Sequence, residues 1–240
     1  MRTFVLMLLF SGAACALPPA DEFQTSAGPV RITPILHASL MIEAGGKVIH
    51  VDPFSQGTGV YDNLPKADLI LITDFHGDHM DSKTIGQVTK PGMQLFAPMV
   101  VTTGIKRGEI IRNGQTKTWG DWTIEAVPMY NLTRGPKAGM LYHDKGRGNG
   151  YVLTYGGKRF YISGDTEVTP EMKALKNIDV AFICMNLPYT MTPLEAAEGV
   201  KAFAPKIVYP YHYRNSDPKV FEAALKATGI EVRLRDWYGK

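Results

Sequence analysis

The sequence predicts an α+β fold in which two β-sheets pack face to face between outer helices, a four-layer αββα sandwich. Short β-rich runs fill the first half of the chain, and strands alternate with helices in the second half. Two Gly-Gly pairs, at positions 45–46 and 156–157, separate neighbouring runs at the spacing of β-hairpins. The 240 residues contain no internal repeat and no low-complexity tract, so we expect one main domain.

The strands are predicted from runs of β-branched and aromatic residues that end at turn-forming residues. They are expected at residues 30–36, 39–44, 47–51, 67–73, 94–97, 122–128, 151–155, 159–163, 180–185 and 207–210. The run at 67–73 is continuously apolar, as in a strand buried on both faces, and it ends abruptly in a polar cluster.

Three helices are predicted from their capping residues. Thr192 is a good N-cap, Pro193 suits the first turn, and Glu195 completes a capping box, so we expect a helix up to Phe203. The other two are expected at 170–175 and at 219–226, the latter opened by Asp217 and Pro218.

Composition and charge argue against a nucleic-acid-binding protein. Hydrophobic residues make up 45% of the chain and charged residues 20%, which is ordinary for a globular protein. The net charge is +3, and there is no cluster of five or more Lys and Arg. A small-molecule substrate is therefore expected, and the sequence makes no prediction about oligomeric state.

The N-terminus has the features of a secretory signal peptide at residues 1–16, followed by a polar linker at 17–28 and the folded domain at 29–240. Arg2 provides a positive start, residues 4–10 form an apolar run, and Ala14-Cys15-Ala16 offers a cleavage site. We therefore expect export, to the periplasm or the medium. One alternative is a buried N-terminal helix. The other is lipidation at Cys15, which would anchor the protein to a membrane.

The most informative stretch follows the strand at 67–73. Four potential metal ligands lie within six residues: Asp74, His76, Asp78 and His79. Imidazole nitrogens and carboxylate oxygens both bind zinc, and alternate positions of an extended segment point the same way. His79 adjoins Asp78 and faces a different direction, so the cluster can serve two ions. The alternative is that Asp78 or Asp81 caps a helix beginning after residue 80.

This stretch resembles the HxHxDH motif of the metallo-β-lactamase superfamily, with Asp74 at the position of the first His. The resemblance covers about residues 30 to 215 and implies the αββα sandwich of that superfamily. It extends to four further landmarks in the expected order: Ile35-Leu36-His37-Ala38-Ser39-Leu40, Val51-Asp52-Pro53-Phe54, Ser163-Gly164-Asp165-Thr166 and Tyr209-Pro210-Tyr211-His212-Tyr213. The first of these resembles the GHxS strand of a branch that includes ascorbate-6-phosphate lactonases and N-acyl-phosphatidylethanolamine phospholipase D.

The resemblance implies two sets of metal ligands. One ion would be bound by Asp74, His76 and a further histidine, and the other by Asp78, His79 and His212, with Asp165 shared. We assign the further histidine to His143, because it alone lies between the HxHxDH-like motif and Gly164. The alternative for His143 is a surface histidine in a mobile loop. Asp78 and Asp165 are the predicted catalytic residues, since they would hold and orient the reactive water.

Zinc is the expected cofactor, as one ion or two. Asp74 adds negative charge and a harder oxygen donor, so the first site would accept manganese or iron better than an all-histidine site. The same replacement would be compatible with a single-metal enzyme. The substitution Asp74→His is predicted to raise zinc occupancy of the first site.

Four residues are expected beside the metals rather than on them: His37, Asp52, Tyr189 and Arg214. Asp52 would accept an imidazole N–H from a ligand and fix its tautomer. Tyr189 and Arg214, together with Tyr211 and Tyr213, flank the metal loops as possible substrate contacts, and Lys145, Arg147 and Arg214 would suit an anionic substrate. His50 is expected to be structural, and Cys184 to be a buried, inert thiol.

The function implied by the resemblance is metal-dependent hydrolysis of an ester, lactone, amide or phosphodiester. Two neighbouring cations lower the pKa of a shared water from about 15.7 towards about 7, which yields hydroxide at neutral pH. The sequence contains no G-x-S-x-G motif and no P-loop. Two alternatives stay open: a catalytically degenerate metal-binding protein, suggested by Asp74, and a nuclease of the same superfamily.

Overall fold

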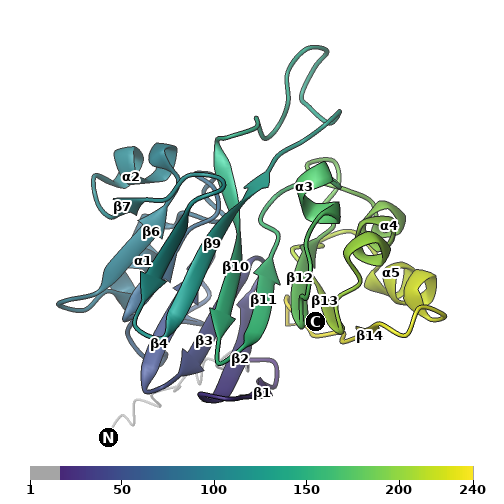
Figure 1. Ribbon diagram of the computed structural model, residues 1–240. Coiled ribbons are helices and arrows are strands. Elements are labelled where there is room, and N and C mark those ends of the chain that lie inside the picture. The colour runs from purple at the N-terminus through teal and green to yellow at the C-terminus, as the bar shows by residue number, and fades with distance from the viewer. Residues whose placement is uncertain (1–16, 240) are drawn as a thin grey trace, which may run out of the picture.

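Two seven-stranded β-sheets form the centre of the molecule in the computed structural model, which describes residues 17–239 (Figure 1). The strands follow one another across each sheet in chain order. The first sheet contains β1 (Asp21–Thr25), β2 (Gly28–Leu36), β3 (Ser39–Ala44), β4 (Lys47–Val51), β5 (Leu69–Leu71), β6 (Gln94–Ala97) and β7 (Glu109–Ile110). The second contains β8 (Thr116–Trp119), β9 (Trp122–Met129), β10 (Gly148–Tyr155), β11 (Lys158–Ile162), β12 (Val180–Cys184), β13 (Ile207–Tyr211) and β14 (Glu231–Val232).

Helices cover the outer face of each sheet. α1 (Ser82–Val88) and α2 (Met99–Ile105) lie against the first sheet, and α3 (Pro170–Lys173), α4 (Pro193–Phe203) and α5 (Pro218–Leu225) lie against the second (Figure 1). One large cluster of buried side chains lies between the sheets and beneath the second-sheet helices, and a smaller cluster lies beneath α1 and α2. The predicted four-layer αββα sandwich is confirmed.

Both predicted hairpins are present. β3 and β4 are joined at Gly45–Gly46, and β10 and β11 at Gly156–Gly157, and all four glycines have positive φ. Glycine adopts this left-handed conformation without the steric cost that a Cβ atom imposes. The tight turns therefore follow directly from the sequence.

Several elements differ from the sequence prediction. The linker expected at 17–28 is wrong for residues 21–25, because Asp21–Thr25 forms β1, which pairs with β2 and buries Phe23. A single apolar residue among polar neighbours is too weak a pattern to indicate such an edge strand. The run at 67–73 contributes only Leu69–Leu71 to the sheet. α1 begins after Asp81, whose carboxylate accepts hydrogen bonds from the backbone of Lys83 and Thr84, so the helix-capping alternative holds for Asp81.

The parallel strands of both sheets end at one edge of the sandwich. β4 to β7 run parallel, as do β11 to β14. The carboxyl ends of parallel neighbours lie at the same edge of a sheet, and ligand sites of open α/β sheets are built there. The connection between β9 and β10, residues 130–147, extends beyond this edge at the top of Figure 1.

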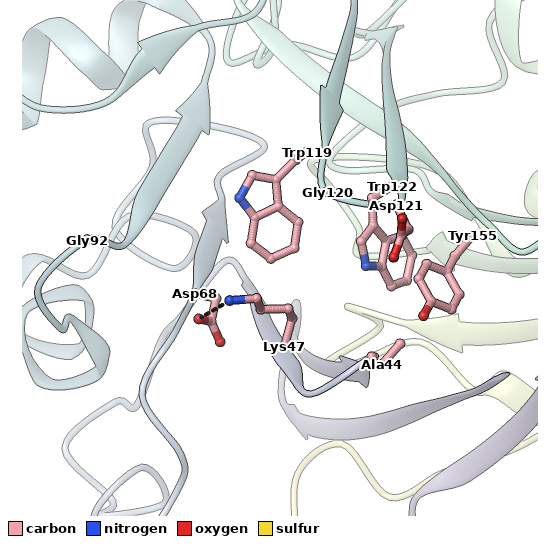
Figure 2. Close-up of a pocket in the computed structure, with 10 residues that line it drawn as sticks. Ala44, Lys47, Asp68, Gly92, Trp119, Gly120, Asp121, Trp122 and Tyr155 are labelled. Carbon is pink, nitrogen blue, oxygen red and sulfur yellow. Dashed lines mark hydrogen bonds and ion pairs between the residues drawn. The ribbon is translucent and has the colours of Figure 1, made fainter. Parts of the chain in front are cut away.

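The opposite end of the sandwich carries hairpin turns and a pocket of about 240 Å³ (Figure 2). Trp119, Trp122 and Tyr155 line it, and Lys47 pairs with Asp68 at 3.5 Å. Within residues 17–239, no helix combines the length and apolar character needed to span a bilayer.

Candidate metal centre

Every residue predicted to ligate a metal lies at the edge where the parallel strands end. The HxHxDH-like segment follows β5, Asp165 follows β11, and His212 follows β13. His143 comes from the long connection between β9 and β10. Three groups of potential ligand atoms form there, the last two sharing His212: Asp74, His76 and His143; His79, Asp165 and His212; and His37, Asp78 and His212.

Asp165 lies between the first two groups. Its Oδ2 is 3.4 Å from Nε2 of His143 and 3.4 Å from Nε2 of His79, and its Oδ1 is 3.4 Å from Nε2 of His212. Burial alone would raise the pKa of this carboxyl, but the imidazoles of His212 and His79 hold the pKa well below its usual range. Asp165 is therefore a charged carboxylate in contact with histidines from both sheets.

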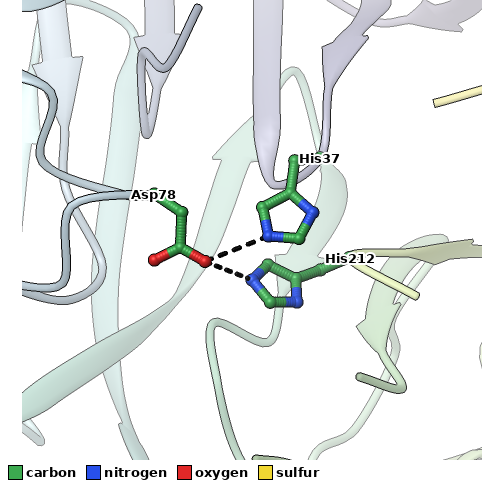
Figure 3. A group of neighbouring side chains, drawn as sticks. All are labelled: His37, Asp78 and His212. Atoms are coloured by element: carbon green, nitrogen blue, oxygen red, sulfur yellow. Dashed lines mark hydrogen bonds and ion pairs between the residues drawn. The ribbon is translucent and has the colours of Figure 1, made fainter. Parts of the chain in front are cut away.

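The third group is formed by His37, Asp78 and His212 (Figure 3). Nε2 of His37 lies 3.0 Å from Oδ2 of Asp78, and the rings of His37 and His212 are tilted by 34° with centroids 3.8 Å apart. Burial lowers the pKa of His37 to about 4, so its imidazole is neutral at pH 7. His37 thus lies at the centre, in contact with a predicted catalytic residue.

The tautomer of His37 follows from a chain of hydrogen bonds. The backbone N–H of Arg214 donates to the hydroxyl of Tyr238, 2.8 Å away, and this hydroxyl is 2.8 Å from Nδ1 of His37. Asp78 is a carboxylate and can only accept, so Nε2 of His37 carries the proton and donates to it, and the Tyr238 hydroxyl donates to Nδ1. Tyr238 was not identified from the sequence, because no local pattern marks a tyrosine that acts across 201 positions.

Asp52 and Asn131 each hold one histidine in a defined orientation. Oδ2 of Asp52 accepts from Nδ1 of His79 at 2.9 Å and from the Thr73 hydroxyl at 2.6 Å. Oδ1 of Asn131 accepts from Nδ1 of His143 at 2.7 Å. In both cases Nδ1 is the donor, so Nε2 is the nitrogen that faces the cluster and can bind a metal ion. Asn131 lies two residues beyond the end of β9 and was not identified from the sequence.

The backbone is strained at three of these positions. His37, Asp52 and His212 have φ of 59°, 44° and 46°, a left-handed conformation that is uncommon for residues with a side chain. Such outliers persist only where the surrounding structure imposes them, and they concentrate at functional sites. Gly164 also has positive φ, and a Cβ atom there would lie 2.5 Å from the sulfur of Met129. Glycine at this position therefore permits the close packing that places Asp165.

The donor set fits a divalent metal ion. Four buried ligand atoms have no hydrogen-bond partner among the described residues: Nε2 of His79, His143 and His212, and Oδ1 of Asp165. A buried polar atom without a partner costs about 1–3 kcal/mol. In each group the potential ligand atoms lie within 4.8 Å of one another, and nitrogen and oxygen donors of this kind suit zinc. Cations bound at the first two groups would satisfy these four atoms.

A pocket of about 310 Å³ opens beside these residues. Its lining residues are His76, Asp78, Tyr142, His143, Asp165, Asn186, Tyr189 and Arg214. The rings of Tyr142 and Tyr189 meet edge to face with centroids 5.0 Å apart. Tyr189 and Arg214, the predicted substrate contacts, both line the pocket, whereas Tyr142 and Asn186 were not identified from the sequence.

The structure corrects several smaller expectations. Tyr211 is fully buried and its hydroxyl accepts from the backbone N–H of Gly164, so it supports the site from beneath instead of contacting substrate. Lys145 pairs with Glu171 at 2.6 Å, and Arg147 pairs with Asp74 at 2.9 Å. Of the three cationic residues expected to suit an anionic substrate, Arg214 is the one that lines the pocket.

Two expectations about buried residues agree with the structure. Cys184 lies fully buried in β12, and burial raises the pKa of its thiol to about 12, so it is not a nucleophile. His50 is fully buried in β4, away from the metal centre, and Nε2 lies 2.9 Å from the carbonyl oxygen of Pro65.

Comparisons with known proteins agree with this geometry. Residues 31–212 match the family model described as a beta-lactamase superfamily domain. The chain is 31% identical over 210 residues to a UPF0173 metal-dependent hydrolase of a Geobacillus species, an alignment that covers 79% of this chain and 90% of the relative. It is also 31% identical over 198 residues to a UPF0173 metal-dependent hydrolase of Thermococcus kodakarensis, covering 79% and 87%.

Solved structures show the same fold. A crystal structure named as that of a metal-dependent hydrolase from Parabacteroides distasonis superposes with a TM-score of 0.87 at 44% identity and covers 92% of this chain and 100% of the other. A metallo hydrolase from Ignicoccus hospitalis superposes with a TM-score of 0.70 at 23% identity, covering 85% and 94%. The chain therefore belongs to the metallo-β-lactamase superfamily and, within it, to the family of UPF0173 metal-dependent hydrolases.

Proposed function

We propose that the protein hydrolyses a small substrate with one or two divalent metal ions, zinc first among them, at the edge of the sandwich. The observation that carries the proposal is the convergence of unpartnered, buried imidazole nitrogens and a carboxylate oxygen beside an open pocket. Asp74, His76 and His143 would hold one ion, and Asp78, His79 and His212 the other, with Asp165 between them. A bound ion supplies Lewis acidity and lowers the pKa of water at the site.

Asp78 and Asp165 are the proposed catalytic residues. Both carboxylates line the pocket, where they can accept hydrogen bonds from an attacking water and orient it. Asp78 is one-third exposed, and its Oδ2 accepts from His37, which holds the carboxylate in one rotamer. Hydrolysis at this site requires no serine or cysteine nucleophile.

The bond cleaved is proposed to be an ester, lactone, amide or phosphodiester. The aromatic pair Tyr142 and Tyr189 offers a surface for an apolar part of the substrate, and Arg214 offers a cation for an anionic part. An anionic substrate is consistent with the resemblance to the lactonase and phospholipase branch. The GHxS-like residues support that resemblance, because His37 contacts Asp78 and the Ser39 hydroxyl donates to the carbonyl oxygen of Asp52 at 2.5 Å.

The substitutions His76→Ala and Asp165→Ala test the proposal. Each is expected to abolish metal-dependent turnover of a panel of esters, lactones and phosphodiesters, because each removes a ligand without disturbing a strand. Asp165→Ala is also expected to reduce zinc content, measured by elemental mass spectrometry. Asp121→Ala provides a matched control, since Asp121 is an exposed carboxylate at the opposite end of the sandwich.

Turnover that is unchanged in either variant would contradict the proposed site. Zinc bound by the unaltered protein, without turnover of any substrate in the panel, would favour a metal-binding protein that is not a hydrolase. Circular dichroism of each variant checks that the fold is retained.

We also propose that the protein is exported after cleavage of residues 1–16. This segment lies outside the described residues, so the support comes from its sequence and from the position of β1. Because β1 begins at Asp21, cleavage near residue 17 would leave the first sheet complete. N-terminal sequencing of protein from the periplasm or the medium is expected to start near residue 17. An intact Met1 would contradict export by this route.

A further inference from the structure

Asp74 differs from its neighbours in the metal centre because it is bound by an arginine. Nε and Nη2 of Arg147 lie 3.2 and 2.9 Å from Oδ1 and Oδ2 of Asp74, a bidentate pair. Asp74 is fully buried, and the Arg147 side chain is only 17% exposed. Burying a carboxylate costs free energy unless it is paired and hydrogen-bonded. The ion pair with Arg147 therefore offsets the cost of burying Asp74.

Arg147 is itself held on several sides. Nη1 donates to the carbonyl oxygen of Tyr142 at 2.7 Å, and the guanidinium lies 4.7 Å from the ring centroid of Phe75. Tyr142 directly precedes His143, so Arg147 links the segment that carries this histidine to the segment that carries Asp74. Oδ2 of Asp74 lies 2.9 Å from Nδ1 of His76 and 3.8 Å from Nε2 of His143.

We propose that Asp74 and Arg147 act as one unit that controls metal affinity at the site formed by Asp74, His76 and His143. Arg147 is a positioning residue in this unit. It neutralises the charge that aspartate adds in place of histidine, and it aligns Asp74 and His143 towards each other. The inference rests on the proposed metal-dependent function. It adds Arg147, which lies outside the HxHxDH-like motif, to the residues that determine metal affinity.

This coupling reverses one prediction from the sequence. The substitution Asp74→His alone would leave the Arg147 guanidinium buried without its carboxylate, close to the histidines that bind the cation. A buried, unpaired charge is strongly unfavourable, and it also repels a second cation. We therefore expect Asp74→His to bind zinc no better than the unaltered protein, and the double variant Asp74→His/Arg147→Met to bind it more tightly than Asp74→His.

The experiment measures zinc stoichiometry and affinity of metal-stripped protein by competition with a chromogenic chelator, together with thermal unfolding with and without zinc. Adding Arg147→Met to Asp74→His is expected to tighten zinc binding by at least about tenfold, because the repulsive charge is removed. Arg147→Met alone is expected to lower the unfolding temperature of the metal-free protein and to enlarge the rise that zinc produces, since zinc replaces the missing positive charge beside Asp74.

Arg159→Met is the matched control. It breaks the partly buried pair of Arg159 and Glu125, whose atoms are 2.9 Å apart in the second sheet, and it should leave the zinc-induced rise unchanged. If Arg147→Met fails to fold, the comparison of Asp74→His with Asp74→His/Arg147→Met still tests the inference. The double variant contains neither the carboxylate nor the guanidinium of the pair, so no unpaired charge is buried in it.

Equal zinc affinity in Asp74→His and in the double variant would overturn the inference and leave the pair a structural salt bridge. Failure of the unaltered protein to bind zinc, manganese or iron would instead overturn the proposed function. The two failures are therefore distinguishable in one set of titrations.

Discussion

His37, His79 and His143 each depend on a second residue that fixes the orientation of the ring. For His79 that residue is Asp52, which also accepts from the backbone N–H of Thr73 at 2.7 Å. Oδ2 of Asp52 accepts from Nδ1 of His79, so this residue favours the tautomer in which Nδ1 of His79 carries the hydrogen. The chemistry of residue 52 thus determines whether Nε2 is free to bind a metal ion.

The substitution Asp52→Asn is therefore expected to weaken zinc binding by about 10–100-fold. The amide oxygen can still accept from Thr73, but the amide NH₂ then faces Nδ1 of His79 and donates to it. The hydrogen of the ring moves to Nε2, which can no longer act as a ligand. Chelator competition measures the change.

Asp68→Asn is the control for this prediction. Asp68 also accepts from a backbone N–H of the first sheet, that of Val48, but it lies at the opposite end of the sandwich. Its substitution should leave zinc affinity unchanged. Equal affinity in the Asp52 and Asp68 variants would show that Asp52 does not control the tautomer.

The elements differ in how strongly the sequence determines them. α4 has the predicted capping box: the Thr192 hydroxyl accepts from the backbone N–H of Glu195, and the Glu195 carboxylate accepts from the backbone N–H of Thr192. α2 has no such signal. It begins with Met99-Val100-Val101-Thr102, and β-branched residues lower helix propensity, so its burial against the first sheet decides its conformation.

The substitution Thr192→Ala is expected to lower the free energy of unfolding by about 1 kcal/mol, because it removes the capping oxygen of α4. Urea denaturation measures the change. Thr192→Ser keeps the oxygen and should retain most of the stability. A loss in the serine variant as large as in the alanine variant would indicate that packing of the threonine methyl group is responsible.

At the scale of the whole molecule, the metal centre joins the two sheets. His76 and His79 follow a strand of the first sheet, whereas Asp165 and His212 follow strands of the second. An ion bound by both sets connects segments that otherwise meet through the core between the sheets. Metal binding is therefore expected to stabilise the global fold.

Chelation of the metal is expected to lower the unfolding temperature, and zinc is expected to restore it. A ligand at 100 times its dissociation constant adds about 2.7 kcal/mol to the free energy of unfolding. Scanning calorimetry of metal-stripped protein, with and without zinc, measures the shift, and Asp165→Ala should lose most of it. An unfolding temperature that does not respond to zinc would contradict a centre shared by both sheets.

The sequence by itself determined the features that depend on neighbours in the chain. The hairpins at Gly45–Gly46 and Gly156–Gly157 and the capping box of α4 are local patterns, and each is found where it was predicted. The run of potential ligands that begins at Asp74 is also a local pattern. Only the tertiary structure placed Tyr238 against His37 and Arg147 against Asp74, partners that lie 201 and 73 positions apart in the chain. Such contacts arise from the order of strands in two packed sheets, and no local pattern of side chains encodes that order.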